Sequence, residues 1–303
     1  MKCTACKKEA LIKLPRHNST LCQECFQKFI QKQTLLAIKR YHMFAKDEPV
    51  LLAVSGGKDS MSLWQILHLL GDQVHAIHID LGIGDFSRNS RLVAEEFARN
   101  QNWPLTVIDV KMETGYNIPE TLKLTHRPAC SACGLVKRYL LNRYALANHF
   151  PVVATGHNLD DEAANLLGNI LRWREDYLAH QSPILPSFHA KLAKKVKPFY
   201  TLTDDEIRTY AQFSDLPFCD EICPLSQRAK SLDYKKALAL LEKQSPGTKH
   251  YFWLTFLEIN ERIFQSHRPA VPFLECTRCG MPTTQERCAF CNIFYPIEQK
   301  ENL

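Results

Sequence analysis

The chain has 303 residues, 45% of them hydrophobic and 23% charged, so it can bury the core of one large domain with small appendages. Its net charge of +6 is compatible with a nucleic-acid partner but does not specify one. It has no apolar run as long as the ~18 residues that a membrane span needs, and no secretory signal at the N-terminus, so we expect a cytoplasmic protein.

The first recognisable element is a cysteine quartet at the N-terminus. A cytosolic chain keeps its thiols reduced, so closely spaced cysteines indicate metal sites or catalysis rather than disulfides. The quartet has the spacing C-x2-C-x15-C-x2-C, which is typical of a tetrahedral zinc site. Its members are Cys3, Cys6, Cys22 and Cys25. We expect them to hold a structural zinc ion.

The central region alternates short β-rich runs with amphipathic stretches. The predicted strands cover residues 49–54, 73–79, 105–110 and 151–156. Residues 62–70 and 90–100 lie between successive strands and have the composition of crossover helices. This alternation predicts an α/β fold with a doubly wound parallel sheet. Ligands of such folds bind at the carboxyl ends of the strands.

A glycine-rich turn, SGGKDS (Ser55 to Ser60), follows the first of these strands and precedes a helix. Gly56 and Gly57 allow the backbone to approach a phosphate closely, and the helix N-terminus favours an anion. The turn matches neither the Walker pattern nor the dinucleotide fingerprint. It resembles the signature of the PP-loop ATP pyrophosphatases, which cleave ATP between the α- and β-phosphates. That resemblance implies that Ser55, Gly56, Gly57 and Ser60 cradle the pyrophosphate. It also implies that Lys58 and Asp59 lie at its edge, where Asp59 would help to hold Mg²⁺.

A Cys-x-x-Cys pair, Cys130 and Cys133, opens a predicted helix that continues to about residue 149. Lys137 follows one turn after Cys133, so all three side chains share one helix face. The helix N-terminus and the lysine both favour a thiolate, so we expect lowered thiol pKa values here. Further ligands are available in the segment FCDEICP, which carries Cys219 and Cys223. Both would complete a zinc site, one would give the three thiolates of a 4Fe–4S cluster, and neither would leave a redox or persulfide pair.

The segment ATGHNLDDEAANLLGNIL begins at the end of the fourth predicted strand and enters a helix. Gly156 allows close approach at the same sheet edge as SGGKDS. Asp160 and Asp161 fall near the helix start, where carboxylates cap the helix and interact favourably with its dipole. We assign the cap to Asp160 and a catalytic or metal-binding role to Asp161. His157 is interpreted as a polar residue of the turn.

Two basic segments lie further along the chain, AKLAKKVK (190–197) and SQRAKSLDYKK (226–236). Either could bind phosphates or form a solvated helix face. A second cysteine quartet near the C-terminus has the tighter spacing C-x2-C-x8-C-x2-C and also indicates structural zinc. Its members are Cys276, Cys279, Cys288 and Cys291. The predicted domains are a zinc module (1–30), a PP-loop ATP pyrophosphatase domain (31–265) and a zinc knuckle (270–295).

The order of these motifs over nearly the whole chain resembles the TtuA-type tRNA 2-thiouridine synthetases. The resemblance implies that Cys130, Cys133 and the proline-flanked Cys223 hold a 4Fe–4S cluster, with Cys219 as a bystander. It places Asp59, Lys137 and Asp161 at catalytic positions and Ala53, Ile79 and Gly156 at nucleotide-contacting positions, with Lys137 also reaching ATP. It further implies a homodimer and a ubiquitin-like sulfur carrier with a C-terminal thiocarboxylate.

The implied reaction is adenylation of the C2 oxygen of a tRNA uridine, followed by its replacement with sulfur. Lys137 and Mg²⁺ would stabilise the developing phosphate charge. The target is either ribothymidine at tRNA position 54 or the wobble uridine at position 34. Two alternatives remain open, namely a persulfide relay in place of the cluster and a non-catalytic, nucleotide-dependent RNA-binding zinc protein. A different PP-loop substrate is disfavoured, because amide chemistry needs no cysteine set.

Overall fold

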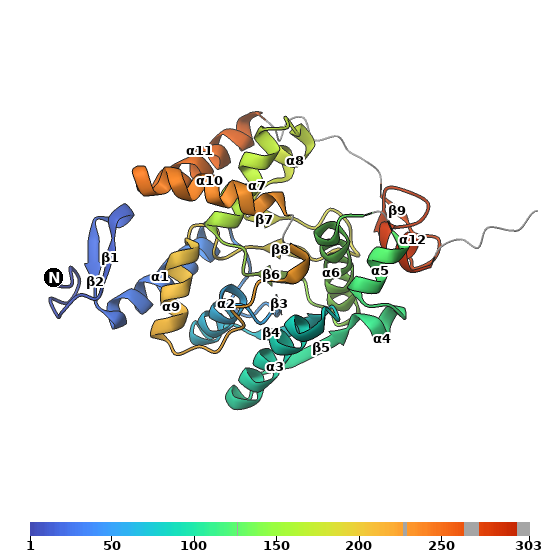
Figure 1. The fold of residues 1–303 in the computed structure, drawn as a ribbon, viewed down its shortest axis with the longest axis horizontal. Helices are drawn as coiled ribbons and strands as arrows, with labels where there is room; N and C mark the ends of the chain where they lie inside the picture. The colour runs from blue at the N-terminus through green and yellow to red at the C-terminus, as the bar shows by residue number, and fades with distance from the viewer. Residues whose placement is uncertain (126, 227–228, 264–272, 296–303) are drawn as a thin grey trace, which may run out of the picture.

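A computed structural model describes residues 1–125, 127–226, 229–263 and 273–295. A six-stranded sheet lies at its centre, in the order β5-β4-β3-β6-β8-β7 (Figure 1). Only the β7–β8 pair at one edge is antiparallel. The strands are β3 (Val50–Ala53), β4 (Val74–Asp80), β5 (Leu105–Asp109), β6 (Val152–Thr155), β7 (Ile184–Leu185) and β8 (Lys194–Val196). The predicted doubly wound α/β fold is confirmed, including all four predicted strands.

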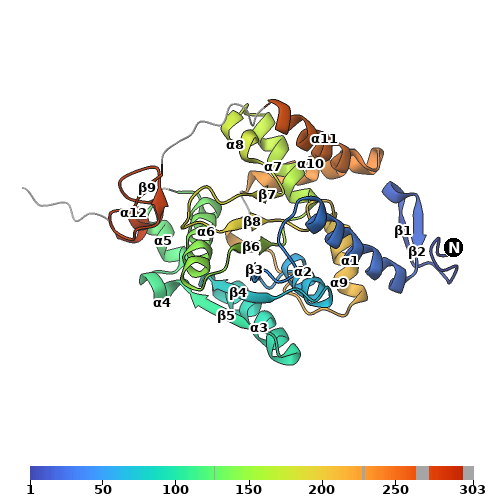
Figure 2. The ribbon, with the colours of Figure 1, turned by 180° about the vertical axis from the view of Figure 1, so that it is seen from behind.

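Helices connect these strands and cover both faces of the sheet (Figures 1 and 2). The helices before β6 are α1 (Gln23–Arg40), α2 (Lys58–Leu69), α3 (Gly84–Gln101), α4 (Val110–Thr114), α5 (Ile118–Leu124) and α6 (Ala129–Ala147). Those after β6 are α7 (Leu159–Ile170), α8 (Glu175–His180), α9 (Asp204–Phe213), the 3₁₀ turn η2 (Pro224–Ser226), α10 (Lys230–Gln244) and α11 (Thr248–Ile263). None of the described helices is both long and apolar enough to cross a membrane.

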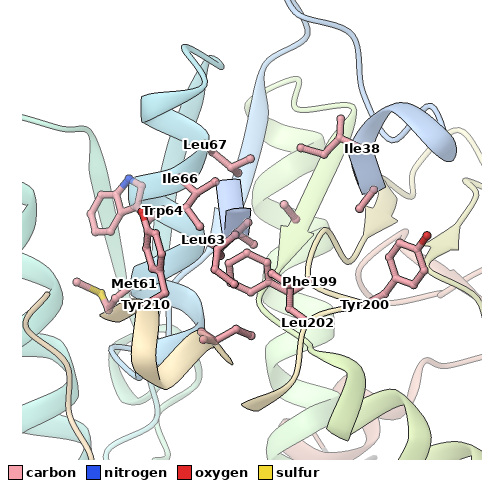
Figure 3. Close-up of a cluster of buried hydrophobic side chains, with 14 of the residues drawn as sticks. Ile38, Met61, Leu63, Trp64, Ile66, Leu67, Phe199, Tyr200, Leu202 and Tyr210 are labelled. Carbon is pink, nitrogen blue, oxygen red and sulfur yellow. The ribbon is translucent and has the colours of Figure 1, made fainter. Parts of the chain in front are cut away.

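Side chains alternate across the sheet and build two separate cores. Leu52 of β3 faces a cluster formed with α1, α2, α3 and α9. Figure 3 shows part of this cluster, with Leu63 and Trp64 of α2 near Tyr210 of α9. Leu51 and Val153 face the opposite way and pack with α6. β3 and β6 are therefore buried on both faces, which explains their continuous apolar runs.

The sheet has a topological switch point at β3. The chain first winds outward through β4 to β5, then returns to place β6 on the other side of β3. The loops after β3 and β6 consequently leave adjacent strands in opposite directions and open a crevice at the carboxyl edge. SGGKDS and the Gly156 turn are these two loops. The fold thus brings together the two motifs that the sequence analysis singled out.

The cysteine quartets form small modules at opposite ends of the molecule (Figure 1). The N-terminal one contains the hairpin β1 (Ile12–Leu14) and β2 (Ser19–Leu21), linked by η1 (Pro15–His17). The C-terminal one contains β9 (Leu274–Glu275), β10 (Pro282–Thr283) and α12 (Ala289–Phe294). It packs on α6, where the rings of Phe290 and Tyr139 stack at 3.6 Å.

Candidate active site

The SGGKDS loop winds back over the first turn of α2. The N–H of Ser55 donates to the Ser60 hydroxyl at 3.0 Å, and that hydroxyl donates to the Gly57 carbonyl at 3.0 Å. Gly56 has φ +79°, and a Cβ there would lie 2.3 Å from the carbonyl oxygen of Ser90. Only glycine fits this position. The loop therefore presents free backbone N–H groups of a helix N-terminus, as a phosphate site requires.

Gly156 brings the β6 turn into direct contact with this loop. A Cβ at Gly156 would lie 3.0 Å from both the Asp59 carbonyl carbon and the Ser60 nitrogen. The close approach predicted for this glycine is therefore toward the PP-loop backbone. Ala53 and Ile79, the other predicted nucleotide-contacting residues, lie at or next to the carboxyl ends of β3 and β4.

Asp59 and Asp161 are linked through Asn158. The Asn158 side-chain amide donates to Asp59 at 3.0 Å, and the Asn158 backbone N–H donates to Asp161 at 3.1 Å. Asn158 is the N-cap of α7, and Asp161 closes a capping box with it. The assignment of the cap to Asp160 is therefore wrong. The buried Asp160 instead accepts a 2.5 Å hydrogen bond from Lys249 and another from the Asp204 N–H.

Two lysines compensate the charges of Asp59 and Asp161. Lys58 contacts Asp59 at 3.0 Å and Asp204, the first residue of α9, at 2.6 Å. Lys235 of α10 contacts Asp161 at 2.5 Å. Asn158, Asp204 and Lys235 were not predicted, because their roles depend on contacts between distant segments. Only the Asn-x-x-Asp spacing of a capping box could have indicated Asn158.

The two central carboxyl groups have opposite pKa shifts. Burial raises the pKa of Asp59, against the lowering effect of Lys58. Burial also opposes ionisation of Asp161, but Lys235 and His157 outweigh it, so the pKa of Asp161 is lowered. The site thus combines Asp161, which stays ionised, with Asp59, which is protonated more readily. Such a pair suits proton transfer and charge stabilisation at one centre.

The cysteine pair on α6 lies beside the segment that contains Cys223. The Cys130 thiol is 4.0 Å from the carbonyl oxygen of Leu225, two residues beyond Cys223. Cys133 and Cys223 pack against the same core cluster, and the pKa of Cys133 responds to charges on Cys223, Cys130 and Lys137. Burial has the largest effect and raises this pKa, so the expected lowering is wrong for Cys133.

Cys219 lies toward the PP-loop instead. Its backbone N–H donates to the Gly56 carbonyl at 2.9 Å, and it is absent from the described cluster that includes Cys133 and Cys223. The sulfurs of each terminal quartet lie within 4.8 Å of one another, as ligands of a single ion do. Among the described residues, the Cys130, Cys133 and Cys223 set has no such tight grouping.

Comparison with known proteins agrees with this geometry. A PP-loop domain model matches residues 22–227, and a model described as the N-terminal LIM domain of 2-thiouridine synthetase TtuA matches residues 2–27. The chain is 44% identical to a tRNA-5-methyluridine(54) 2-sulfurtransferase of Thermus thermophilus, covering 99% of this chain and 93% of the relative. It is 42% identical to the protein of that name in Thermotoga maritima, covering 100% and 99%.

More distant relatives also match nearly the whole length of this chain. The chain is 26% identical to cytoplasmic tRNA 2-thiolation protein 1 of Saccharomyces cerevisiae, covering 98% of this chain and 86% of the relative. A solved structure, the U34-tRNA thiolase NcsA of Methanococcus maripaludis with its [4Fe-4S] cluster, superposes with a TM-score of 0.82 at 25% identity. The match covers 97% of this chain and 95% of that one.

Proposed function

Because this chain belongs to the PP-loop family and, within it, to the TtuA-type tRNA 2-thiouridine synthetases, we propose that it thiolates tRNA in an ATP-dependent reaction. It is a sulfurtransferase that adenylates the C2 oxygen of a uridine and replaces that oxygen with sulfur. One observation carries this proposal: residues 219–225 contact both the PP-loop and α6. The Cys219 backbone contacts Gly56 of the loop, and the Leu225 carbonyl, two residues beyond Cys223, contacts Cys130 of α6.

We place the target at ribothymidine 54 rather than at the wobble uridine. The relatives named for position 54 are 42–44% identical to this chain, whereas the U34-tRNA thiolase is 25% identical. The test is mass spectrometry of nucleosides from the tRNA of a strain that lacks this gene. Loss of 2-thioribothymidine alone is expected, and loss of a thiolated wobble uridine instead would contradict the assignment.

The mechanism assigns distinct tasks to the residues of the crevice. The backbone of Ser55 to Ser60 holds the ATP phosphates, and Asp59 lies where it can bind the accompanying Mg²⁺. The uridine O2 attacks the α-phosphate, so an O–P bond forms and pyrophosphate leaves. Lys137 and Asp161 orient the reacting groups and compensate charge. Sulfur then bonds to C2, and the C–O bond breaks with release of AMP.

The cysteines beside this crevice are suited to a cofactor. Cys130, Cys133 and Cys223 would hold a 4Fe–4S cluster, and three thiolate ligands would leave one iron available for the incoming sulfur atom. The contact between Cys130 and the segment that follows Cys223, and the separate position of Cys219, support this set. Each terminal quartet would hold one zinc ion, because four thiolates close a structural site.

The persulfide alternative is tested by composition. Protein purified without oxygen should contain iron and acid-labile sulfide in a near 4:4 ratio per chain, as a 4Fe–4S cluster requires. Zinc alone with retained thiolation would overturn the cluster and leave the relay. A Cys219→Ser variant should keep its iron, whereas Cys223→Ser should lose it.

The remaining partners follow from the family. A ubiquitin-like carrier with a C-terminal thiocarboxylate would supply the sulfur, and the protein would act in the cytoplasm. A homodimer is supported by an apolar groove of ≈ 760 Å³ between the end of α7 and α11. Its lining includes Ile170, Phe252 and Phe256, and the rings of Trp173 and Tyr251 at its rim are each 75% exposed. Such a large apolar surface is typical of a protein interface.

A further inference from the structure

The basic segment 190–197 contains four lysines, and three of them have acidic partners. Lys191 contacts Glu275, Lys194 contacts Glu48 and Lys197 contacts Glu162. Lys195 differs, since no ion pair or hydrogen bond of its side chain is found within the described ranges. Because Lys194–Val196 form strand β8 and pair with β7, the interpretation of 190–197 as a helix face is wrong.

The register of the sheet fixes the direction of Lys195. Lys195 pairs with Val153 of β6, and laterally paired residues project to the same face. Val153 packs in the core cluster that α6 builds through Val136 and Leu140. Lys195 therefore projects toward the α6 face, whereas Lys194 pairs with Val152 on the opposite face.

A second cation without an anionic partner lies on α6. The guanidinium of Arg138 folds back over Gly134, where a Cβ would lie 3.1 Å from Nη1. No carboxylate within the described parts of the chain contacts Arg138, although Arg143 on the same helix pairs with Glu113. Arg138 follows Lys137 directly and lies within electrostatic reach of Cys133.

The two cations are close enough to affect each other. Burial and then the charge of Arg138 lower the pKa of Lys195 to about 8. Lys195 is half-buried and Arg138 is exposed, and like charges that approach each other without a counterion raise the free energy of the protein in the absence of a ligand. That arrangement is typical of a site whose counterion arrives with a ligand.

We propose that Arg138 and Lys195 form a binding site for a phosphate group beside the candidate active site. The site is displaced along the sheet from the PP-loop, because β8 is the second strand from β3 and adjacent strands lie about 4.8 Å apart. The ligand is a backbone phosphate of the RNA substrate, an assignment that rests on the proposed function. The site fixes the strand that carries the reacting uridine over α6.

The test compares tRNA binding by wild type, Arg138→Gln and Lys195→Gln at several salt concentrations, using fluorescence anisotropy. Each variant should weaken binding roughly fivefold near physiological salt and reduce the slope of log K against log salt by about 1. Lys195→Arg should restore affinity. The control is Lys194→Gln, which removes the same charge from the opposite face and should leave both quantities nearly unchanged.

A second arm distinguishes the source of the phosphate. Binding of ATP and of inorganic pyrophosphate should be the same in all five proteins, with equal melting temperatures as the folding control. If the two variants weaken nucleotide binding and leave tRNA binding intact, the site belongs to the nucleotide and the RNA assignment is overturned. If neither ligand is affected, the phosphate site itself is overturned. If the wild type does not bind tRNA at all, that result contradicts the proposed function itself, whatever the variants do.

Discussion

At the scale of single residues, the site depends on how Lys235 acts on Asp161. Lys235 comes from α10, more than seventy positions later in the chain, yet its ammonium group lies 2.5 Å from the carboxylate. It offsets the burial that would otherwise favour the protonated form of Asp161. Lys235 is therefore a positioning residue that acts through the carboxylate.

Replacing Lys235 by methionine should raise the pKa of Asp161, because the lowering charge is removed while burial remains. As the pH falls, Asp161 would then become protonated at a higher pH than in the wild type. We expect the acidic limb of the thiolation rate to shift upward by about one pH unit, measured in single-turnover assays. Lys236→Met, at the exposed neighbouring position, is the matched control. An unshifted profile with a uniformly lower rate would indicate a purely structural contact.

The lysine at position 195 makes a second prediction at this scale. Its pKa of about 8 means that it loses its proton as the pH rises through 8, while Arg138 on the facing helix stays charged. Affinity for tRNA should fall by a few fold between pH 7 and 9, measured by anisotropy at constant salt. Lys195→Arg should abolish that fall. A pH-independent wild type would contradict the predicted titration.

At the scale of elements, α9 connects the N-terminal module to the PP-loop. Arg16 contacts both oxygens of Glu206 at 2.8 Å and the Thr201 carbonyl at 3.0 Å. Glu206 also closes the capping box at Thr203, and Asp204, the residue after Thr203, contacts Lys58. The module therefore holds the start of a helix whose first residue orients the PP-loop lysine.

Glu206→Gln should lower the free energy of unfolding by about 3 kcal/mol at neutral pH, because Arg16 stays buried without a charged partner. Burial opposes ionisation of Glu206, but His17 and Arg16 outweigh it and lower the pKa of the carboxyl group. The contribution of ionised Glu206 to the free energy of unfolding is complete above the ordinary glutamate pKa. It is lost as the pH falls through the lowered pKa of Glu206 in the folded protein. Urea unfolding at pH 7 and pH 3 measures both effects. Asp205→Asn, at the exposed neighbour, should change stability by less than about 0.5 kcal/mol.

The sequence predicts the buried elements of this fold better than its edges. β3 and β6 are continuous apolar runs and β4 and β5 are largely apolar, so their alternation with helical segments indicates a parallel sheet. β7 and β8 have only two and three residues, and β8 is lysine-rich, so neither was recognised as a strand. The site divides similarly, because Asp59 and Asp161 belong to local motifs, whereas Asp204 and Lys235 reach it through tertiary packing. Their partners are not encoded in any short spacing.

At the scale of the whole molecule, the apolar groove predicts a dimer. Trp173 lines this groove, and the residues that adjoin it in the sequence carry both signs of charge, which suits a two-fold contact of this face with itself. These residues are Arg172, Arg174, Glu175 and Asp176. Trp173→Ser should therefore yield monomers in light scattering at micromolar concentration. Leu69→Ser, on an exposed position of α2, is the control and should remain dimeric. A monomeric wild type would contradict the prediction.

The cysteine modules make a prediction about stability. Cys3 and Cys22 belong to the main core, and Cys276, Cys288 and Cys291 belong to the second. Loss of zinc would therefore loosen both cores, because structural zinc contributes directly to folding free energy. A strong chelator should lower the melting temperature by more than about 5 °C in calorimetry. Readdition of zinc should restore it, and an unchanged transition would exclude structural zinc.

The contact between Cys130 and Leu225 has a consequence for biosynthesis. It joins positions 95 residues apart, whereas the N-terminal quartet is complete once Cys25 has been made. On the ribosome, the first module can capture its ion early, but the pair on α6 must wait for η2 to emerge and dock. If Cys130, Cys133 and Cys223 hold the proposed cluster, its loading is a late event in biosynthesis, because a nascent or truncated chain that ends before Cys223 has only two of the three proposed ligands.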